Sequence, residues 1–490
     1  MALALLFAVL LLLSLPFLIL KHSKSTKVAP LPPGPKPWPI LGNLLETMGT
    51  KPHLALAQLA KLHGPLISLR LGTQLFIVGS SPAAATEILK THDRQLSGRH
   101  IPDVLTIFAK KPELNRLAWT DLSDEWKSFR ALMKANLFSP NMVDNQSCIR
   151  EKIVGEMLEY LGTKEGDLIR IRDAIFVFIF NSLGNYYFSR DFITFDGEDS
   201  KKVSKLVREM IKLSIAPNIS DLYPLLSFLD LQGLRNKSDE CVRKLRLLWD
   251  SYIRDRRATK LFGDVSDFLD VLIQSGFSDE QISYIFVEML GGVSDSSTST
   301  IEWAMAELIK NPEQMKKLRM ELEEAIPAGK MVKESDLADL AYLHACVKET
   351  LRLHPPAPLL IPRRATESCR VMNYMIPKDA HVLVNVWAIA RDPSVWEDPL
   401  SFKPERFIIN SELDYKGNNF EYLPFGGGRR VCAGIPTATR QVELALASLL
   451  LNFEWSLPNN VPPHELDMGE SFSLTMMKEQ PLELLAKQIK

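Results

Sequence analysis

The chain has 490 residues, of which 46% are hydrophobic and 24% are charged, so it can bury a large core. Its formal net charge of −1 excludes a protein that binds nucleic acid through an overall basic field. The five cysteines are widely spread and contain no CxxC pair, which argues against a disulfide framework or a zinc motif. They indicate reduced thiols in a protein that faces the cytosol.

The first segment, residues 1–20, contains no charged side chain and is long enough to span a bilayer as a helix. We therefore predict an uncleaved transmembrane anchor. The alternative, a cleaved signal peptide, needs a basic start, a shorter apolar core and a small-residue cleavage site. Lys21, Lys24 and Lys27 follow directly and predict that the body of the protein lies in the cytosol. In that topology three Asn-x-Ser sequons stay unglycosylated: Asn145, Asn218 and Asn236.

A basic and proline-rich linker is predicted at residues 21–41. The prolines of APLPPGPKPWPILGN, residues 29–43, restrict the backbone and favour a stiff, extended path. From residue 42 onward the sequence has no repeat, low-complexity stretch or long Gly/Ser linker. We therefore predict one catalytic domain over residues 42–490.

The periodicity of this domain is mostly that of helices. Residues 281–310 keep an apolar helical pattern for longer than an average helix, and residues 336–353 form a second amphipathic stretch that ends before His-Pro-Pro. Strand patterns are short and occur at residues 66–72, 75–80 and 381–389. The predicted fold class is therefore mainly α with a small β portion (α+β), with an N-terminal transmembrane helix.

The stretch FGGGRRVCAG, residues 425–434, places Cys432 behind three glycines and an arginine pair. A helical pattern with an early proline begins at residue 433, so the cysteine precedes a helix N-terminus, which favours an anion such as a thiolate. A single thiolate in a large helical body, without CxxC or a nearby histidine, is typical of an axial haem ligand. Two alternatives stay open from the residues alone: a small buried hydrophobe, or a phosphate-cradling loop, although GxxxxGK[ST] is absent.

A second group of residues combines one acid with two bases. Glu349 and Arg352 are three residues apart, so they share one face of a helix. Arg406, in the segment PERF, would complete a buried Glu/Arg/Arg network. The alternative is an ordinary solvated ion pair.

A third group lies in the middle of the predicted 281–310 helix. Asp295 and Ser296 belong to the run GGVSDSSTST, in which glycines and hydroxyl side chains weaken a helical backbone. We expect a locally opened helix whose acid and hydroxyl relay protons to a bound oxygen. The alternative is a kink or packing site.

In chain order these motifs resemble those of the cytochromes P450, from the proline-rich linker to the C-terminus. FGGGRRVCAG is similar to the haem-binding signature F-x-x-G-x-R-x-C-x-G at its five defining positions: Phe425, Gly428, Arg430, Cys432 and Gly434. ETLR fits the E-x-x-R motif of that family, and PERF fits its partner segment. The resemblance implies the cytochrome P450 fold, haem b (iron protoporphyrin IX) as cofactor and O2 as co-substrate.

The resemblance also implies roles for individual residues. Cys432 would be the thiolate ligand of the haem iron, and Asp295 and Ser296 would deliver protons. Further cofactor contacts, mainly to the haem propionates, would come from Trp126, Arg130, Arg430, Arg99, Arg363, Phe425 and Gly434. The core on the haem side would be stabilised by Glu349, Arg352 and Arg406. Substrate contacts would come from the loop at residues 101–108 and from Gly292, Leu359, Leu360, Leu474 and Thr475.

Two positions depart from the family pattern. Val293 stands where glycine is usual, and Ser296 stands where threonine is usual. Serine keeps the hydroxyl group, whereas valine would tighten the helix groove that admits oxygen. The departures concern oxygen activation and not haem binding.

The finer resemblance is to plant microsomal enzymes that hydroxylate benzylisoquinoline alkaloids or couple their phenols. It is carried by PPGPKPWPILGNLL, EILKTHDRQLSGR, STSTIEWAM and ETLRLHPPAPLLIPRRATESC. It implies oxidation of a small, largely apolar plant metabolite in alkaloid biosynthesis. The alternatives are a monoterpenoid hydroxylase, a haem-thiolate isomerase or dehydratase that needs no reductase, and an anchored binding protein without haem.

The sequence contains no flavin or nicotinamide fingerprint, so the electrons must come from another protein. The resemblance implies a membrane-bound NADPH-cytochrome P450 reductase that docks on the cysteine side. Lys127, Lys134 and Arg429 are candidate basic contacts for it. The resemblance also implies a single-pass protein of the endoplasmic reticulum membrane with its catalytic domain in the cytosol.

Overall fold

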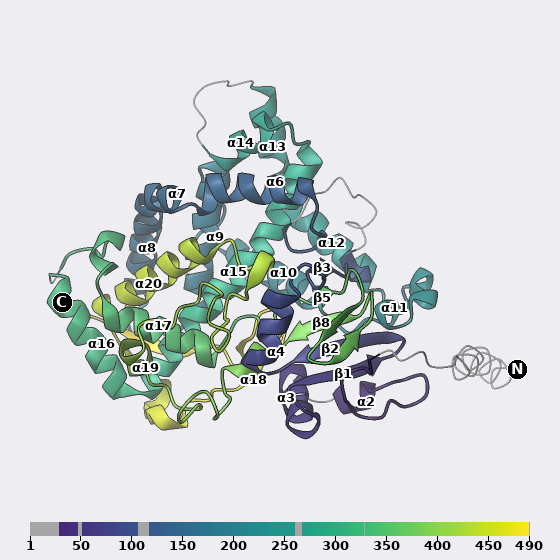
Figure 1. Cartoon of the computed structure of the whole chain (residues 1–490). Coiled ribbons are helices and arrows are strands. Elements are labelled where there is room, and N and C mark those ends of the chain that lie inside the picture. The colour runs from purple at the N-terminus through teal and green to yellow at the C-terminus, as the bar shows by residue number, and fades with distance from the viewer. Residues whose placement is uncertain (1–28, 48–50, 106–116, 260–266, 328, 490) are drawn as a thin grey trace, which may run out of the picture.

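The computed structural model describes residues 29–47, 51–105, 117–259, 267–327 and 329–489. Helices make up most of these residues, and short strands form small sheets (Figure 1). The mainly helical fold class predicted from the sequence is confirmed. The predicted transmembrane anchor, residues 1–20, lies outside the described ranges, and within those ranges no helix is both long and apolar enough to cross a bilayer.

The helices follow one another along the whole chain. In the first half they are α2 (Leu44–Thr47), α3 (Pro52–His63), α4 (Pro82–Thr86), α6 (Asp124–Met133), α7 (Pro140–Asn145), α8 (Ser147–Gly162), α9 (Ile171–Phe188), α10 (Glu198–Ser214) and α11 (Ile219–Leu222). In the second half they are α12 (Leu234–Arg246), α13 (Asp250–Ala258), α14 (Phe268–Gln274), α15 (Asp279–Lys310), α16 (Pro312–Ala325), α17 (Ala341–Leu353), α18 (Val386–Ile389), α19 (Glu405–Ile409) and α20 (Ile435–Asn452).

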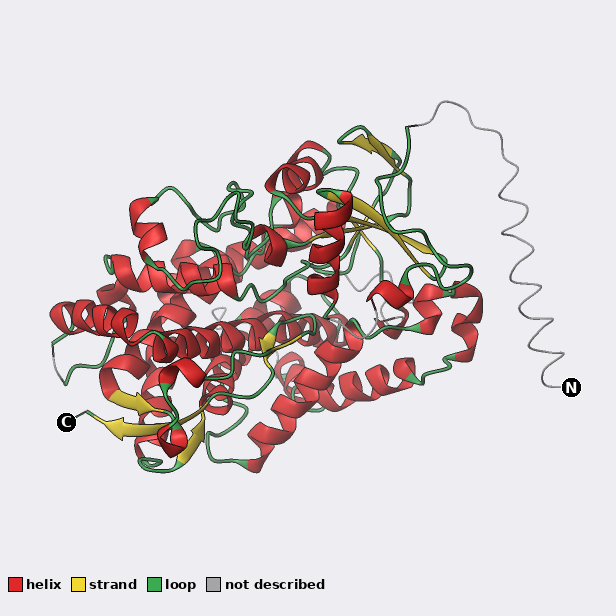
Figure 2. Cartoon of the chain, turned by 90° about the horizontal axis from the view of Figure 1, so that it is seen from below, coloured by secondary structure: helices red, strands yellow, loops and turns green. Residues whose placement is uncertain are grey.

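The two larger sheets lie at opposite ends of the helical body (Figure 2). The five-stranded sheet has the order β1-β2-β8-β5-β3, with β1 (Leu66–Leu71), β2 (Gln74–Gly79), β3 (Gly98–Arg99), β5 (Arg363–Arg364) and β8 (His381–Val384). Only β2 and β8 pair in parallel within it. The three-stranded sheet contains β4 (Leu168–Arg170), β12 (Glu483–Gln488) and β9 (Phe453–Ser456). Two antiparallel pairs complete the strands: β6 (Cys369–Val371) with β7 (Tyr374–Ile376), and β10 (Glu470–Ser471) with β11 (Met477–Lys478).

Two of the three predicted strands are confirmed, and the third is wrong in its second half. β1 and β2 form the antiparallel pair expected at residues 66–80. β8 stops at Val384, because the side chain of Asn385 accepts a hydrogen bond from the N–H of Ala388 at 3.0 Å and caps α18. The apolar run predicted as one strand therefore turns into a short helix.

The long central helix is confirmed as α15, but the expected local opening is wrong. α15 is helical from Asp279 to Lys310 without interruption. The hydroxyl of Ser296 donates to the carbonyl of Gly292 at 3.0 Å, and that of Thr300 donates to Ser296 at 2.8 Å. These hydroxyls use carbonyls of their own helix, and the packing of neighbouring helices around α15 outweighs the poor local propensity.

The helix predicted at 336–353 begins later than expected. Residues 334–337 form a separate 3-10 turn, and α17 starts at Ala341. The carboxylate of Glu321 on α16 accepts the N–H groups of Tyr342 and Leu343 at 2.7 and 2.9 Å. An acid from another helix therefore caps α17 and fixes where it begins.

The polar middle of α15 lies between two hydrophobic clusters. The first part of the helix, up to Leu290, packs in one cluster, and the part from Ile301 onward packs in the other. Val293 contacts both clusters. The residues between them, Asp295 and Ser296 included, therefore lie at the centre of the protein.

Candidate active site

The cysteine loop is held by close backbone packing. Cys432 lies three residues before α20 and donates its N–H to the carbonyl of Phe425 at 3.1 Å. Gly428 has φ +68°, and a Cβ at this position would lie 2.2 Å from the carbonyl oxygen of Leu89. Only glycine fits such a position, because a side chain would be strained and would clash. The glycines of the motif thus allow the loop to pack directly on the segment that follows α4.

The side chain of Cys432 has accessible surface, although α20 behind it is largely buried. Burial raises the pKa of the Cys432 thiol, and the N–H of Gly434 and the charge of Arg130 act in the opposite direction. The helix start therefore does not by itself produce the thiolate expected from the sequence, and a metal cation at the sulfur would favour it.

Two guanidinium groups lie over one indole ring beside this loop. Trp126 and Arg130 come from α6, and Arg430 comes from the turn before Cys432. The guanidinium carbons of Arg130 and Arg430 lie 5.4 and 4.8 Å from the centre of the indole. Arg130 also donates to the carbonyl of Val431 at 2.6 Å. Arg430 donates to the backbone carbonyls of Ser97, Leu117 and Thr120.

Two further arginines enter from the five-stranded sheet. Arg99 on β3 and Arg363 on β5 are paired residues of neighbouring antiparallel strands. Burial lowers the pKa of Arg99 well below its ordinary value, and the charges of Arg430 and Arg363 lower it further. Burial also lowers the pKa of Arg430 to about 10, with Arg363 and Arg130 adding to the effect. The structure thus gathers four guanidinium groups that repel one another in a poorly solvated place.

The acceptors around these arginines carry little negative charge. Arg99 donates to the carbonyls of Ala118, Ile361 and Pro362. Asp93 accepts from Arg363 at 2.9 Å and is shared with Arg429 at 3.2 Å. Asp121 binds Arg364 as well as the backbone N–H of Arg99. Positive charge therefore remains in excess, and this is the environment that a ligand with two carboxylates requires.

Asp295 lies within the electrostatic influence of two more arginines, Arg208 and Arg172. Its side chain is 1% exposed, and its Oδ1 has no hydrogen-bond partner among the described residues. Burial raises the pKa of Asp295 to about 6, although the charges of Arg208 and Arg172 lower it. A carboxyl group with this pKa takes up and releases protons near neutral pH.

The neighbours of Asp295 leave open space on α15. Gly292 is exposed within this otherwise buried helix, and a Cβ there would meet no atom within 4 Å. Ser296, one turn further on, is half-buried. The helix thus offers an accessible strip beside its buried acid.

The predicted substrate residues fall into two places. Leu474 packs on the same cluster as Val293 and Ala433, next to the cysteine loop, and Thr475 beside it is buried. Leu359 belongs instead to a small cluster beside the five-stranded sheet. Leu360 has φ +54° and lies near the backbone of Gly426, since a Cβ on that glycine would be 3.6 Å from it. Of the loop at 101–108, residues 106–108 lie outside the described ranges.

Glu349, Arg352 and Arg406 meet in a buried network. Arg352 donates to both oxygens of Glu349 at 2.7 and 2.8 Å, and Arg406 donates to Glu349 at 3.3 Å. The remaining N–H groups of Arg352 bind the carbonyls of Ala390, Pro399 and Ser401. The network joins α17 and α19 to the backbone at residues 390–401.

Comparison with known proteins identifies the family of this chain. The sequence matches the family described as "Cytochrome P450" over residues 32–486. The chain belongs to the cytochrome P450 family. It is a monooxygenase of this family, with haem as the cofactor that the family implies.

Plant proteins are similar to this P450 over almost its whole length. A probable (S)-N-methylcoclaurine 3'-hydroxylase isozyme 2 of Coptis japonica is 46% identical, with 96% of this chain and 95% of that protein covered. The corytuberine synthase of Coptis japonica is 44% identical, with 93% and 94% covered. The geraniol 8-hydroxylase of Swertia mussotii is 41% identical, with 94% of each chain covered.

The residues present fit a haem group. The accessible Cys432 offers a sulfur ligand, and the arginine cluster beside it has excess charge for two propionates. Sequence reasoning missed Asp93, which supports this cluster, and Arg208 and Arg172, which act on Asp295. Arg208 and Arg172 stand in no motif, so only the packing of their helices against α15 shows them.

Replacement of Gly428 by alanine is expected to destabilise the protein by about 2 to 4 kcal/mol, because backbone strain and a clash with Leu89 add together. Gly166→Ala is the matched control, since Gly166 also has positive φ but has no atom near its Cβ position. The control should cost only about 1 kcal/mol. Urea unfolding measures both values, and equal losses would contradict the packing argument.

Replacement of Asp295 by asparagine is expected to stabilise the protein at neutral pH while it impairs turnover. The folded carboxyl has a pKa of about 6 and the unfolded one has its ordinary value near 3.8, so the folded state holds the extra proton between these values. Stability of the native protein should therefore fall as pH rises through this window. The advantage of the variant should grow from pH 4 to pH 6 and reach at most about 3 kcal/mol. Thermal unfolding at a series of pH values measures it, and a pH-independent difference would contradict the assignment.

Proposed function

We propose that this P450 hydroxylates a benzylisoquinoline-type alkaloid with O2 and with electrons from an NADPH-cytochrome P450 reductase. The observation that carries the proposal is the 46% identity, over 96% of the chain, to a protein named as an (S)-N-methylcoclaurine 3'-hydroxylase. The surroundings of the site support a small, largely apolar substrate, because Val293, Ala433 and Leu474 all pack on one hydrophobic cluster.

We assign the site residues roles that follow from their positions. Cys432 is the metal ligand, and Arg99, Arg130, Arg363 and Arg430 hold the propionates with Trp126 beneath two of them. Phe425 and Gly434 shape the loop around the sulfur. Haem ligated by a thiolate supplies the reductive activation of dioxygen when it is bound.

Asp295 acts in this proposal as the proton store of the site. Its Oδ1 can hold a proton near neutral pH, and the hydroxyl of Ser296 next to it can pass one on. To do so, Ser296 must leave the carbonyl of Gly292, to which it now donates. The exposed Gly292 leaves room on this side of α15 for the substrate.

Phenol coupling is the second candidate reaction. It is favoured by the 44% identity to a corytuberine synthase and by the departures at Val293 and Ser296 from the family pattern. Monoterpenoid hydroxylation is supported more weakly, by the 41% identity to a geraniol 8-hydroxylase.

The reaction is tested with the full chain, a reductase, NADPH and an ¹⁸O2 atmosphere. N-methylcoclaurine is the lead substrate, and geraniol is the alternative. We expect one ¹⁸O atom in a hydroxylated alkaloid, and none with Cys432→Ala. A coupled product without label would replace hydroxylation by phenol coupling, and turnover of geraniol alone would exclude the alkaloid proposal. Turnover without NADPH would point to an isomerase or dehydratase.

We propose that the reductase docks beside α6 and the cysteine loop. Arg130 on α6 reaches Val431, so α6 lies against this loop. Lys127 and Lys134 are exposed on and after α6, and Arg429 is exposed on the loop itself. These three cations form a surface that an acidic partner can approach.

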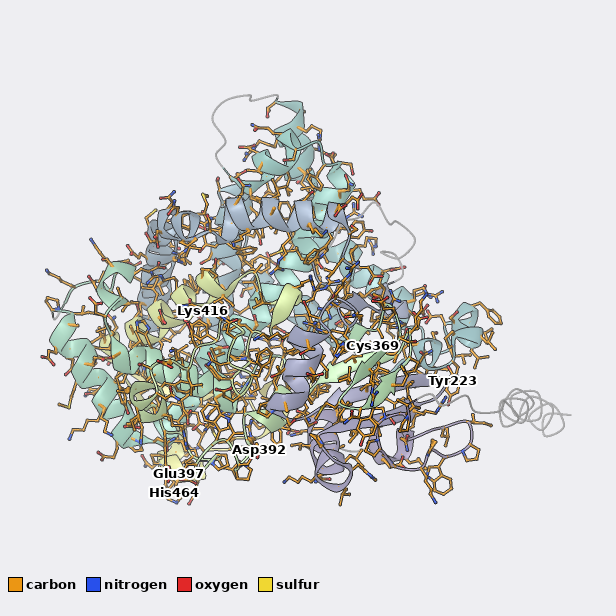
Figure 3. The ribbon with its side chains drawn as sticks, in the orientation of Figure 1. Tyr223, Cys369, Asp392, Glu397, Lys416 and His464 are labelled. Atoms are coloured by element: carbon orange, nitrogen blue, oxygen red, sulfur yellow. The ribbon has the colours of Figure 1, made fainter. Side chains whose placement is uncertain are left out.

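We also propose a membrane protein of the endoplasmic reticulum, with residues 1–20 as anchor, 21–41 as linker and 42–490 as catalytic domain. Exposed apolar side chains near the described N-terminal end support this placement. Leu225 and Phe228 are 83% and 76% exposed, and Trp38, Leu41 and Leu45 are exposed as well. Tyr223, labelled in Figure 3, joins the two segments because its hydroxyl donates to Ile40 at 3.1 Å. Such a patch suits a lipid surface next to the anchor.

Replacement of Leu225 and Phe228 by aspartate should weaken membrane binding of a chain that starts at residue 29. We expect at least about ten-fold less protein on phospholipid vesicles, because two large apolar side chains no longer enter the bilayer. Ile409→Asp is the control, since Ile409 is equally exposed but lies on α19 at the other end of the molecule. Vesicle flotation measures the bound fraction, and equal binding of all three proteins would refute the patch.

A further inference from the structure

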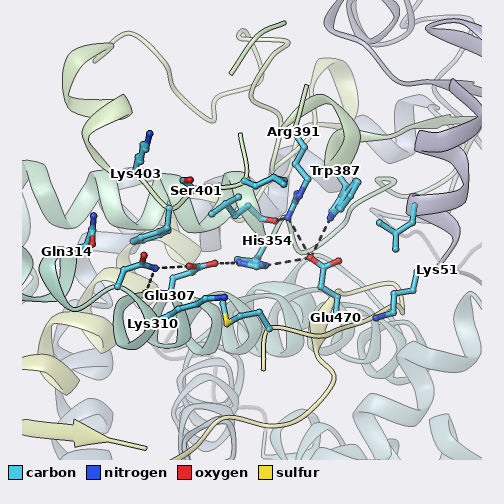
Figure 4. Close-up of a pocket in the computed structure, with 16 residues that line it drawn as sticks. Lys51, Glu307, Lys310, Gln314, His354, Trp387, Arg391, Ser401, Lys403 and Glu470 are labelled. Atoms are coloured by element: carbon cyan, nitrogen blue, oxygen red, sulfur yellow. Dashed lines mark hydrogen bonds and ion pairs between the residues drawn. The ribbon is translucent and has the colours of Figure 1, made fainter. Parts of the chain in front are cut away.

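A pocket of about 650 Å³ opens on the surface away from the candidate active site. It lies where the C-terminal ends of α15 and α17 meet α18, and none of the residues assigned to the active site lines it. Figure 4 shows two acids, Glu307 and Glu470, on either side of His354, with Arg391 above them. Its volume is that of a site for a small molecule.

The two acids of this pocket are already engaged. Glu307 binds His354 at 2.7 Å and Asn311 at 3.2 Å. Glu470 lies 3.2 Å from His53 and 3.5 Å from the indole N–H of Trp387. Burial would raise the pKa of Glu470, but hydrogen bonds from His354 and His53 and the charge of Arg391 lower it far below its ordinary value. These carboxylates are therefore compensated by the protein itself.

Two cations of the pocket are less well satisfied. The side chain of Arg391 is 10% exposed, and its Nη1 has no hydrogen-bond partner in the ranges that the structure describes. Its other contacts are the carbonyl of Leu353, the face of Trp387 at 4.2 Å and Glu470 at 3.6 Å. Lys310, the last residue of α15, has no ion-pair partner within those ranges. Nη1 of Arg391 is almost fully buried, so this side chain must shift to meet an acceptor in the pocket, whereas Lys310 is only half-buried and lines the pocket. An unpaired buried donor is costly, so such a shift is favoured when an acceptor enters.

The remaining residues that line the pocket include two more cations and several apolar side chains. Lys51 and Lys403 stand at the rim, where each also has an acidic partner outside the pocket. Trp387, Leu400 and Phe402 supply an apolar wall. The combination is suited to a molecule with one anionic group and an apolar or aromatic body.

We propose that this pocket binds a small organic anion, a phosphate or carboxylate on an aromatic or aliphatic body, with Arg391 and Lys310 as its charged contacts. The pocket adjoins the Glu349/Arg352/Arg406 network, because Arg352 donates to Ala390, next to Arg391, and to Ser401, which lines the pocket. A bound anion should therefore stabilise the folded haem protein without entering the active site.

The test is isothermal titration of the full-length, haem-loaded protein in detergent with phenyl phosphate, benzylamine and inorganic phosphate. We expect saturable binding of phenyl phosphate and a raised unfolding temperature. Benzylamine should not bind to this site, and inorganic phosphate should bind more weakly because it lacks the apolar body. The Soret band should stay unchanged, which separates this site from the active site.

Variants assign the binding to the pocket. Lys310→Gln should weaken phenyl phosphate about ten-fold, and Arg391→Gln should abolish its binding. Lys316→Gln, an exposed lysine of α16 that does not line the pocket, should bind like the unchanged protein. If Arg391→Gln does not fold, Lys310→Gln decides the matter. Binding that survives Lys310→Gln unchanged, or binding of benzylamine that Glu307→Gln removes, would overturn the proposal.

Discussion

The buried positive charge around the cysteine loop is the constraint on which the rest of the site depends. The four guanidinium groups come from four separate segments of the chain: β3, α6, β5 and the turn before Cys432. Each uses backbone carbonyls as acceptors, so the arginines join these segments to one another. Their mutual repulsion is tolerable only if anions are nearby, and the two aspartates there are already shared. The four arginines that join these segments therefore also create an environment that an anionic cofactor would stabilise.

Incomplete neutralisation of a buried charge also determines the properties of Asp295. The positive charges of Arg208 and Arg172 lower the pKa of Asp295, but its Oδ1 has no hydrogen-bond partner among the described residues. The effect of burial is therefore larger, and the pKa rises to about 6. Arg172 is itself neutralised by Glu302 at 2.6 Å, which limits what it contributes to Asp295. A carboxyl group left partly uncompensated in this way keeps a proton within reach of neutral pH. Full pairing with either arginine would have made it a permanent anion.

The sequence predicted correctly those elements whose formation depends on apolar periodicity and capping within the element itself. The pair β1–β2 and the helix α15 follow from apolar periodicity, and α15 has its own capping box at Ser278 and Gln281. The start of α17 is fixed by a contact from elsewhere, because Glu321 of α16 caps it. The end of β8 is fixed locally by Asn385, which caps α18, and Asn385 also donates to the carbonyl of His53. No reading of residues 336–353 alone reveals the acid that sets their first turn.

The residues of the candidate site also fall into two groups: those in sequence motifs and those whose role depends on packing. Cys432, Arg430 and the Glu349–Arg352 pair stand in motifs, so the sequence predicts them together. In the structure α17, which carries the pair, packs against α20, which follows Cys432. Arg208 has no motif, because its relation to Asp295 exists only through the packing of α10 on α15. Arg391 is a similar case, since its neighbours Glu470 and Leu353 are distant in sequence. Spacing rules along the sequence do not detect charges whose partners lie on other elements. In this protein such charges surround both Asp295 and the proposed anion pocket.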